Sequence, residues 1–212
     1  MTDYFYLDVV RQDILAIVPP DGKVIGSIGC GRGATERTLV EAGREVHGVD
    51  VAPEAIEHAK QRLTSARQIG IDDLTPFDAE SLDGLILADV LEHLPFAWKR
   101  LAGYAKMVKP GGWVSISTPN MRYLETLYTL AVRGDWPEQP TGTFDETHIQ
   151  VMTHRRLLRW ADDAGLSLDR WSKRYDNRLV PRNVYRATDY LTARIFHSLF
   201  TPVVQGVFRR KN

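Results

Sequence analysis

A glycine-rich turn between a strand and a helix is the feature that most constrains the fold of this chain. The segment KVIGSI, residues 23–28, is an apolar run typical of a buried strand, and Gly29, Gly31 and Gly33 follow it directly. Glycines let the backbone bend sharply and approach a ligand, while the N-terminus of the next helix offers N–H groups without helical partners. Because open parallel sheets bind ligands beside such strand ends, the turn predicts a ligand site.

The spacing of the three glycines narrows the class of ligand. Dinucleotide sites use G-x-G-x-x-G, whereas here the third glycine comes one residue earlier, and no lysine of a phosphate-binding P-loop follows. Asp50, at the end of the next expected strand, is placed where a carboxylate can accept two hydrogen bonds from a ribose. These features favour an adenosine ligand without a pyrophosphate.

The order of apolar and amphipathic segments predicts the fold class. Apolar runs alternate with amphipathic stretches, which indicates an α/β protein with a Rossmann-like, doubly wound and mostly parallel sheet and helices on both faces. Strands are expected at residues 23–28, 44–50, 68–71, 84–89, 113–117 and 166–175. Helices are expected at residues 3–18, 34–42, 53–66, 96–108, 121–133 and 153–165.

Length and composition suggest one domain with an extension. With 212 residues, 43% of them hydrophobic, the chain can bury one full core. We assign residues 1–176 to a single domain, in which 119–152 form an insert with a helix that covers the ligand site, and 177–212 to a C-terminal extension. The single cysteine and the absence of a signal-like start lead us to expect a cytoplasmic protein.

Four segments, in family order, carry a resemblance to a known family: SIGCGRG, VHGVDVAPEAIEHAK, LDGLILADVLEHLP and MVKPGGWVSISTPN. Together they resemble the class I S-adenosylmethionine-dependent methyltransferases over residues 23–120. Two longer segments, VRQDILAIVPPDGKVIGSIGCG and FDETHIQVMTHRRLLRWADDAGL, resemble small bacterial methyltransferases associated with surface-polysaccharide or glycolipid synthesis.

The resemblance implies S-adenosylmethionine as the cofactor. In the family the glycine loop passes under the methionine part of the cofactor, an acid after the second strand binds the ribose hydroxyls, and an acid after the third strand contacts the adenine amino group. One departure is Ser27, because most relatives carry there an acid that helps to anchor the amino group of the cofactor. For the acid after the third strand, Asp72 is preferred over Asp73. The cofactor-binding residues implied are Gly29, Cys30, Gly31, Gly33, Asp50, Val51, Asp72, Ala88 and Asp89.

A histidine in the expected insert is the candidate catalytic base. Transfer of a methyl group to an aliphatic or sugar hydroxyl needs a proton acceptor, and the pKa of histidine lies near the working pH. His148 stands in the segment DETHIQVMT, and Asp145, three residues earlier, is placed to orient its ring. The alternatives are that His93 is the base or that His148 only packs.

A short acidic motif raises the question of a metal. Asp89, Glu92 and His93 form a D-x-x-E-H pattern. A related group of ubiquinone-pathway methyltransferases has E-x-x-E-H here and is linked to a divalent metal, but many metal-free relatives also carry LEHL. We expect no metal ion.

The C-terminal segment is basic and is expected to be an amphipathic helix. From Arg170 onward there are ten Lys and Arg against two acids, although the formal net charge of the whole chain is zero. Apolar pairs recur every four or five residues over 187–211, with Pro202 as a kink. Such a segment can lie on the inner face of an anionic membrane, pack on its own domain or form a homodimer.

These expectations favour one function over two alternatives. The favoured function is that of an S-adenosylmethionine-dependent O-methyltransferase that acts on a small molecule or a saccharide, as in polysaccharide biosynthesis. The rivals are a methyltransferase for quinone-type or polyketide phenols, and a non-catalytic cofactor-binding partner or sensor. A nucleic-acid substrate is not expected, because no aromatic and basic groove motif is present.

Overall fold

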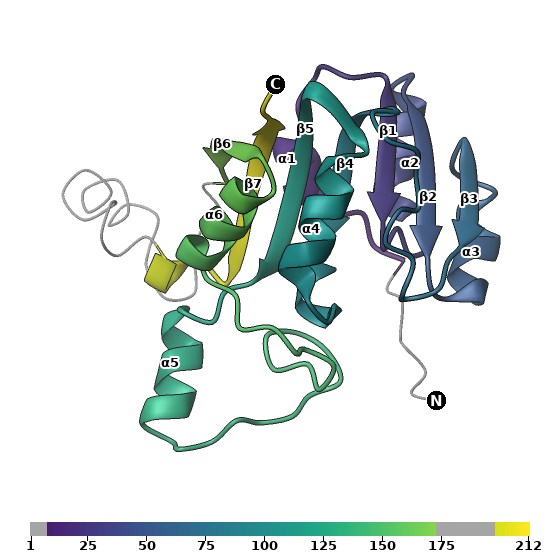
Figure 1. Ribbon diagram of the computed structural model, residues 1–212. Helices are drawn as coiled ribbons and strands as arrows, with labels where there is room; N and C mark the ends of the chain where they lie inside the picture. The colour runs from purple at the N-terminus through teal and green to yellow at the C-terminus, as the bar shows by residue number, and fades with distance from the viewer. Residues whose placement is uncertain (1–7, 173–197) are drawn as a thin grey trace.

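A seven-stranded sheet forms the centre of the molecule (Figure 1). The computed structural model describes residues 8–172 and 198–212. The strand order is β3-β2-β1-β4-β5-β7-β6, and neighbouring strands from β3 to β5 pair in parallel, whereas β7 is antiparallel to both of its neighbours. The strands are β1 (Val24–Ile28), β2 (Glu45–Asp50), β3 (Ser65–Gln68), β4 (Leu82–Ala88), β5 (Val108–Pro119), β6 (Leu166–Trp171) and β7 (Val203–Arg210).

Helices cover both faces of the sheet, which confirms the predicted α/β class. Leu101 of α4 and Trp160 of α6 belong to the core cluster on one face. Ile14 of α1 and Leu39 of α2 belong to the cluster on the other face, together with Trp113. The helices are α1 (Gln12–Ile17), α2 (Ala34–Glu41), α3 (Pro53–Ala59), α4 (Ala97–Ala105), α5 (Leu124–Ala131) and α6 (His154–Asp163), and a short 3-10 helix, η1, spans Leu91–His93.

Several element boundaries differ from the sequence-based expectation. The helix expected at 3–18 is confined to α1, with residues 3–7 outside the described part of the chain. The helix expected at 53–66 ends at Ala59, and the strand that follows lies three residues earlier than expected, at Ser65–Gln68. This edge strand reads SARQ and lacks apolar residues that alternate with polar ones, so the sequence gives no strand period to detect.

The helix and the strand on either side of Gly165 lie close to their predicted positions. The Thr153 hydroxyl accepts a hydrogen bond from the backbone N–H of Arg156 at 3.2 Å, which makes Thr153 the N-cap of α6. Gly165, in the left-handed conformation with φ +74°, ends the turn after the helix. The chain then enters β6, the strand expected at 166–175.

The C-terminal extension departs from the predicted amphipathic helix, because only residues 198–200 of its described part are helical. Residues 203–210 form β7, which lies between β5 and β6 and completes the sheet. Most of this strand is buried, so its run VVQGVF has no alternation, and Pro202 precedes the strand, where a missing N–H is tolerated. Gly206 is required there, since a Cβ atom would lie 2.7 Å from the Trp171 ring. Residues 187–197 lie outside the described part.

Basic residues of the same segment pair with acids of the domain. Arg209 contacts Asp21 at 2.6 Å, and Lys211 contacts Asp162 at 2.6 Å. Arg210 pairs with Glu80 at 2.9 Å. The described part of the basic segment therefore faces its own domain rather than an external anion.

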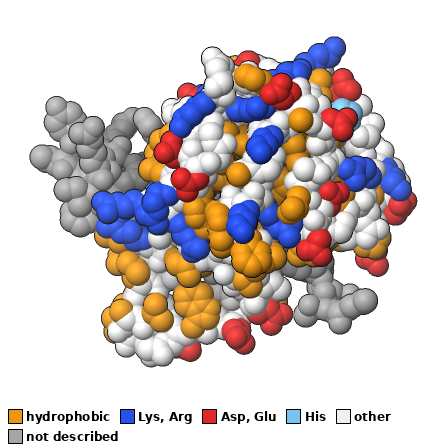
Figure 2. All heavy atoms as spheres, in the orientation of Figure 1, with side chains coloured by type: hydrophobic (Ala, Val, Ile, Leu, Met, Phe, Trp, Pro, Cys, Tyr) orange, Lys and Arg blue, Asp and Glu red, His pale blue; other side chains and the backbone are white. Residues whose placement is uncertain are grey.

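The expected insert extends beyond the sheet and carries α5 (Figure 1). Figure 2 shows hydrophobic side chains gathered over this helix. The exposed apolar residues of α5 and its C-terminal end are Leu124, Tyr128, Leu130 and Val132. Across residues 8–172 and 198–212, no helix has the length and hydropathy needed to cross a membrane.

Candidate functional site

The glycine loop after β1 adopts a conformation that only glycines hold without strain. Gly29, Gly31 and Gly33 have φ values of +71°, +53° and +73°. A Cβ atom at Gly29 would lie 2.6 Å from a methyl group of Val90. Gly33 is also the N-cap of α2, so the loop leads directly into the N–H groups of that helix.

Asp50 holds this loop from the end of β2. Its carboxylate accepts hydrogen bonds from the backbone N–H of Gly31 at 2.8 Å and of Ala52 at 3.0 Å. The side chain is buried, and the two oxygens of a carboxylate offer about four lone-pair sites for hydrogen bonds. A ribose placed over the loop supplies two hydroxyl donors, so the arrangement fits the nucleoside part of S-adenosylmethionine.

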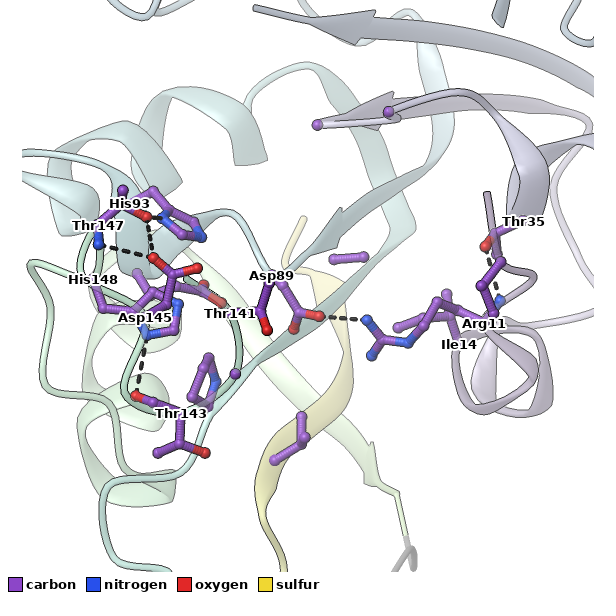
Figure 3. A pocket seen from close by; sticks show the side chains of 18 of the residues that line it. Arg11, Ile14, Thr35, Asp89, His93, Thr141, Thr143, Asp145, Thr147 and His148 are labelled. Carbon is purple, nitrogen blue, oxygen red and sulfur yellow. Dashed lines mark hydrogen bonds and ion pairs between the residues drawn. The ribbon is translucent and has the colours of Figure 1, made fainter. Parts of the chain in front are cut away.

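A cavity of about 680 Å³ opens beside the glycine loop. Segments far apart in the sequence form its walls: the chain before α2, the end of β4, the insert and the start of β7. Figure 3 shows Asp89 between Arg11 on one side and the two histidines on the other. Of the predicted site residues, those that line the cavity are Gly29, Cys30, Gly31, Ala88, Asp89, Asp145 and His148.

Asp89 stands in the middle of the cavity in an uncommon backbone conformation. Its φ is +55°, a region that residues other than glycine adopt rarely and mostly at functional sites. The Ser117 hydroxyl donates to its carboxylate at 2.7 Å, and Arg11 pairs with the other carboxylate oxygen. These contacts fix the carboxylate of Asp89, one of the cofactor-binding residues that the resemblance implies, at the cavity wall.

Two histidine rings contact each other on the side of Asp89 opposite to Arg11 (Figure 3). The ring centroids of His93 and His148 are 4.7 Å apart, although one residue follows β4 and the other belongs to the insert. The Nδ1 atom of His148 lies 3.2 Å from the carbonyl oxygen of Thr143. Because a carbonyl can only accept, Nδ1 carries the proton, and Nε2 is the basic nitrogen of His148.

Asp145 contacts the histidine pair through Thr147 rather than by the predicted hydrogen bond to His148. The Thr147 hydroxyl donates to the Asp145 carboxylate at 2.5 Å and lies 2.9 Å from Nδ1 of His93. That hydroxyl has a single proton, so it accepts the proton of His93 Nδ1. Burial and the neighbouring His148 lower the pKa of His93.

The residues that could hold a metal ion differ from those of the sequence motif, because His148 takes the place of Asp89. Ligand atoms of Glu92, His93 and His148 lie within 4.8 Å of one another. Asp89, in contrast, is directed to Ser117 and Arg11. Burial raises the pKa of Glu92 well above its usual range. Among the described residues these three side chains are therefore the group that could hold a metal ion, and His93 and His148 line the cavity.

Four predicted cofactor residues lie outside the cavity wall. Gly33 and Asp50 stand behind the loop, as described above, and Val51 follows on the surface with 47% of its area exposed. The side chain of Asp72 is 93% exposed, and its carboxylate oxygen lies 3.5 Å from a guanidinium nitrogen of Arg100. Contact of Asp72 with the adenine stays a prediction.

The sequence did not point to several residues of the cavity wall, among them Arg11, Glu36 and Thr147. Arg11 stands just before α1, Glu36 in the first turn of α2 and Thr147 beside the candidate base. Glu36 was within reach of sequence reasoning, because it is an acid three residues after the last glycine of the loop. Arg11 had no such signal, since its contact with Asp89 spans 78 positions.

A class I methyltransferase architecture is defined by three features of this structure. They are a parallel sheet with one antiparallel strand inserted near its edge, a glycine loop after β1, and a carboxylate at the end of β2. Comparison with known proteins agrees: the family described as a methyltransferase domain matches residues 4–170. The chain belongs to this family, whose cofactor is S-adenosylmethionine.

Curated relatives are about a third identical to the chain over the aligned residues. A ubiquinone biosynthesis O-methyltransferase of Coxiella burnetii is 31% identical over 154 residues, which cover 69% of this chain. The chain spans 64% of the length of that relative. A protein of the same name from Hydrogenovibrio crunogenus is 32% identical over 182 residues, which cover 81% of this chain and 72% of the relative.

Solved structures share the fold at lower identity. A SAM-dependent methyltransferase from Archaeoglobus fulgidus has a TM-score of 0.60 at 20% identity, covering 89% of this chain and 86% of that one. An S-adenosylmethionine-dependent methyltransferase from Mesorhizobium loti has a TM-score of 0.66 at 16% identity, covering 94% and 96%.

Proposed function

We propose that the protein is an S-adenosylmethionine-dependent O-methyltransferase that acts on a hydroxyl group of a small molecule. One observation carries the proposal: the glycine loop and the pair His93 and His148 line the same cavity. A cofactor held by the loop and an acceptor held by the histidines would then meet beside Asp89. A protein that only binds the cofactor has no need for basic side chains at that position.

His148 is the proposed catalytic base. When bound, S-adenosylmethionine would supply an electrophilic methyl group, which would pass from its sulfur to the acceptor oxygen. The proton of the acceptor hydroxyl passes to Nε2 of His148, while the Thr143 carbonyl, bonded to Nδ1, stabilises the imidazolium that forms. Alignment of the acceptor by the cavity walls supplies much of the rate.

A phenolic acceptor is favoured over the saccharide expected from the sequence. The relatives named above are ubiquinone biosynthesis O-methyltransferases, and we extend their chemistry to this chain as a proposal. Apolar residues on the insert side of the cavity suit a planar ring: Pro119, Pro140, Pro202 and Val203. A phenol has a pKa near 10, so a histidine removes its proton more readily than that of a sugar hydroxyl.

The test is a transfer assay with purified protein. S-adenosylmethionine labelled in its methyl group is incubated with catechol or, separately, with methyl glucoside, and the product is identified by mass spectrometry. The proposal predicts a labelled methyl ether of catechol and little label on the glucoside. Label on the glucoside alone would overturn the phenolic class. Binding of the cofactor without transfer to either acceptor would favour the sensor alternative.

A further inference from the structure

A buried glutamate on α2 reaches the cavity beside the glycine loop. Glu36 is only 5% exposed and lies in the first turn of the helix that the loop leads into. The hydroxyl of Ser27, on β1, donates to its carboxylate at 2.8 Å. Two neighbouring elements therefore fix this carboxylate at the wall of the cavity.

The carboxylate has no cationic partner within the described residues. No Lys, Arg or His among residues 8–172 and 198–212 forms an ion pair with Glu36. The nearest arginine along the cavity wall, Arg11, directs its guanidinium to Asp13 and Asp89. An ionised carboxylate buried without a cation is destabilising in the folded state, and a buried titratable group at a cavity wall is a candidate for a ligand contact.

The surroundings of Glu36 oppose its ionisation when no ligand is bound. Burial raises the pKa of Glu36 to about 7, and the negative charge of Asp50 adds to the effect, while the hydrogen bond from Ser27 counteracts it. Cys30 is the other titratable group nearby, and burial together with Glu36 raises the pKa of its thiol, so Cys30 stays neutral. A cation in the cavity would reverse this balance and favour the carboxylate.

The cofactor of this family carries such a cation. Besides its sulfonium, S-adenosylmethionine has an ammonium group at the end of its methionine part. We propose that Glu36 binds this ammonium through a charge-assisted hydrogen bond. The inference rests on the proposed function only in taking S-adenosylmethionine as the ligand.

The contact between Ser27 and Glu36 explains how the chain manages without an acid on β1. The family resemblance implies an acid at the position of Ser27. Because the two side chains touch here, a carboxylate placed on either one reaches the same corner of the cavity. In this chain the acid comes from α2 and the hydroxyl from β1.

The experiment compares ligands with and without the ammonium group. Affinities of the purified chain for S-adenosylmethionine, S-adenosylhomocysteine and methylthioadenosine are measured by calorimetry at pH 7.5. Only methylthioadenosine lacks the amino acid part. Glu36→Gln is expected to weaken binding of the first two ligands by about tenfold to a hundredfold and to leave methylthioadenosine unchanged. Glu41→Gln, an exposed glutamate on the same helix, is the matched control and should change none of them.

Two further measurements separate binding of the ammonium from a structural role. The double variant Ser27→Asp with Glu36→Gln places a carboxylate on β1 in place of the one removed from α2. It should restore most of the lost affinity for S-adenosylmethionine and S-adenosylhomocysteine. In the wild type, affinity for S-adenosylhomocysteine should rise several-fold from pH 6 to 7.5 as Glu36 ionises, whereas affinity for methylthioadenosine should stay level. This pH series remains informative if Glu36→Gln does not fold.

The outcomes distinguish the inference from the function it rests on. Equal weakening of all three ligands by Glu36→Gln, no weakening at all, or a wild-type pH series with no difference between the ligands would overturn the assignment of Glu36. A wild-type chain that binds none of the three ligands would overturn the proposed function itself.

Discussion

The carboxylate of Asp50 and the backbone N–H of Gly31 lie 2.8 Å apart, and this hydrogen bond joins the end of β2 to the glycine loop. We expect Asp50→Ala to weaken S-adenosylmethionine binding at least tenfold, because the ribose loses its acceptor and the loop loses its support. Calorimetry measures the effect, with the exposed Glu54→Ala on α3 as the control. Unchanged affinity in Asp50→Ala would contradict the role of this carboxylate.

The two histidines can be separated by their effects on turnover. His148→Ala should lower turnover by roughly two to four orders of magnitude and leave cofactor affinity nearly intact, since the base acts only on the acceptor. Initial rates of methyl transfer at saturating cofactor measure this, with the exposed His58→Ala as the control. If His93→Ala abolishes transfer and His148→Ala does not, then His93 is the base.

Thr147 provides a test of how Asp145 acts. Thr147→Val removes the hydroxyl that connects the Asp145 carboxylate with His93. We expect turnover to fall by about tenfold, since His93 would lose an orienting hydrogen bond beside the base. Thr147→Ser keeps the hydroxyl and should retain near-normal rates. Equal losses in the valine and serine variants would point to packing of the methyl group instead.

Chelation tests whether the cavity histidines hold a metal. The proposed proton transfer needs only the protein side chains, so we expect methyl transfer to be unaffected by excess EDTA. Rates before and after dialysis against the chelator are compared. A loss of activity that Mg²⁺ or Mn²⁺ restores would contradict this expectation and assign the ion to Glu92, His93 and His148.

A fifth prediction concerns the stability of the sheet. The ion pair with Lys109 and the N–H groups of Val24 and Lys23 lower the pKa of Asp83 from 3.8 to about 2. A lowered pKa stabilises the fold above the unfolded-state value, and this stabilisation is lost as pH falls through about 2. Asp83→Asn should therefore lower the free energy of unfolding by about 1 kcal/mol at neutral pH, with allowance for solvent screening.

Denaturant melts across pH check this prediction. The difference between the wild type and Asp83→Asn should be constant above pH 5 and shrink as pH falls from 4 toward 2. Asp78→Asn, on the exposed loop before β4, is the control and should differ little from the wild type at any pH. A difference for Asp83→Asn that persists at the lowest pH would show that the ion pair is not its origin.

The sequence predicted the part of the site that depends on local backbone geometry. The strand before Gly29 and the acid at Asp50 are signals within one strand–helix–strand unit, and both lie where they were expected. His148 was also placed in the cavity, because residues after a fifth strand must return over the open end of the sheet.

Long-range contacts were beyond sequence reasoning. β7 was missed because a strand buried on both faces has no alternating pattern, and its partners, β5 and β6, are fixed only by the folded sheet. The hydrogen bond of His148 went to the Thr143 carbonyl rather than to Asp145, a choice made by the conformation of the loop. Backbone acceptors of this kind leave no signature in residue identity.

The central claim is that the cofactor lies over the glycine loop with its methionine end toward Glu36 and its sulfur near Asp89. A crystal structure of the full chain with S-adenosylhomocysteine measures this directly. We expect the ribose hydroxyls at Asp50, the ammonium within hydrogen-bond distance of Glu36, and an open path from the sulfur to His148. The nucleoside bound elsewhere, or the loop blocked by side chains, would contradict it.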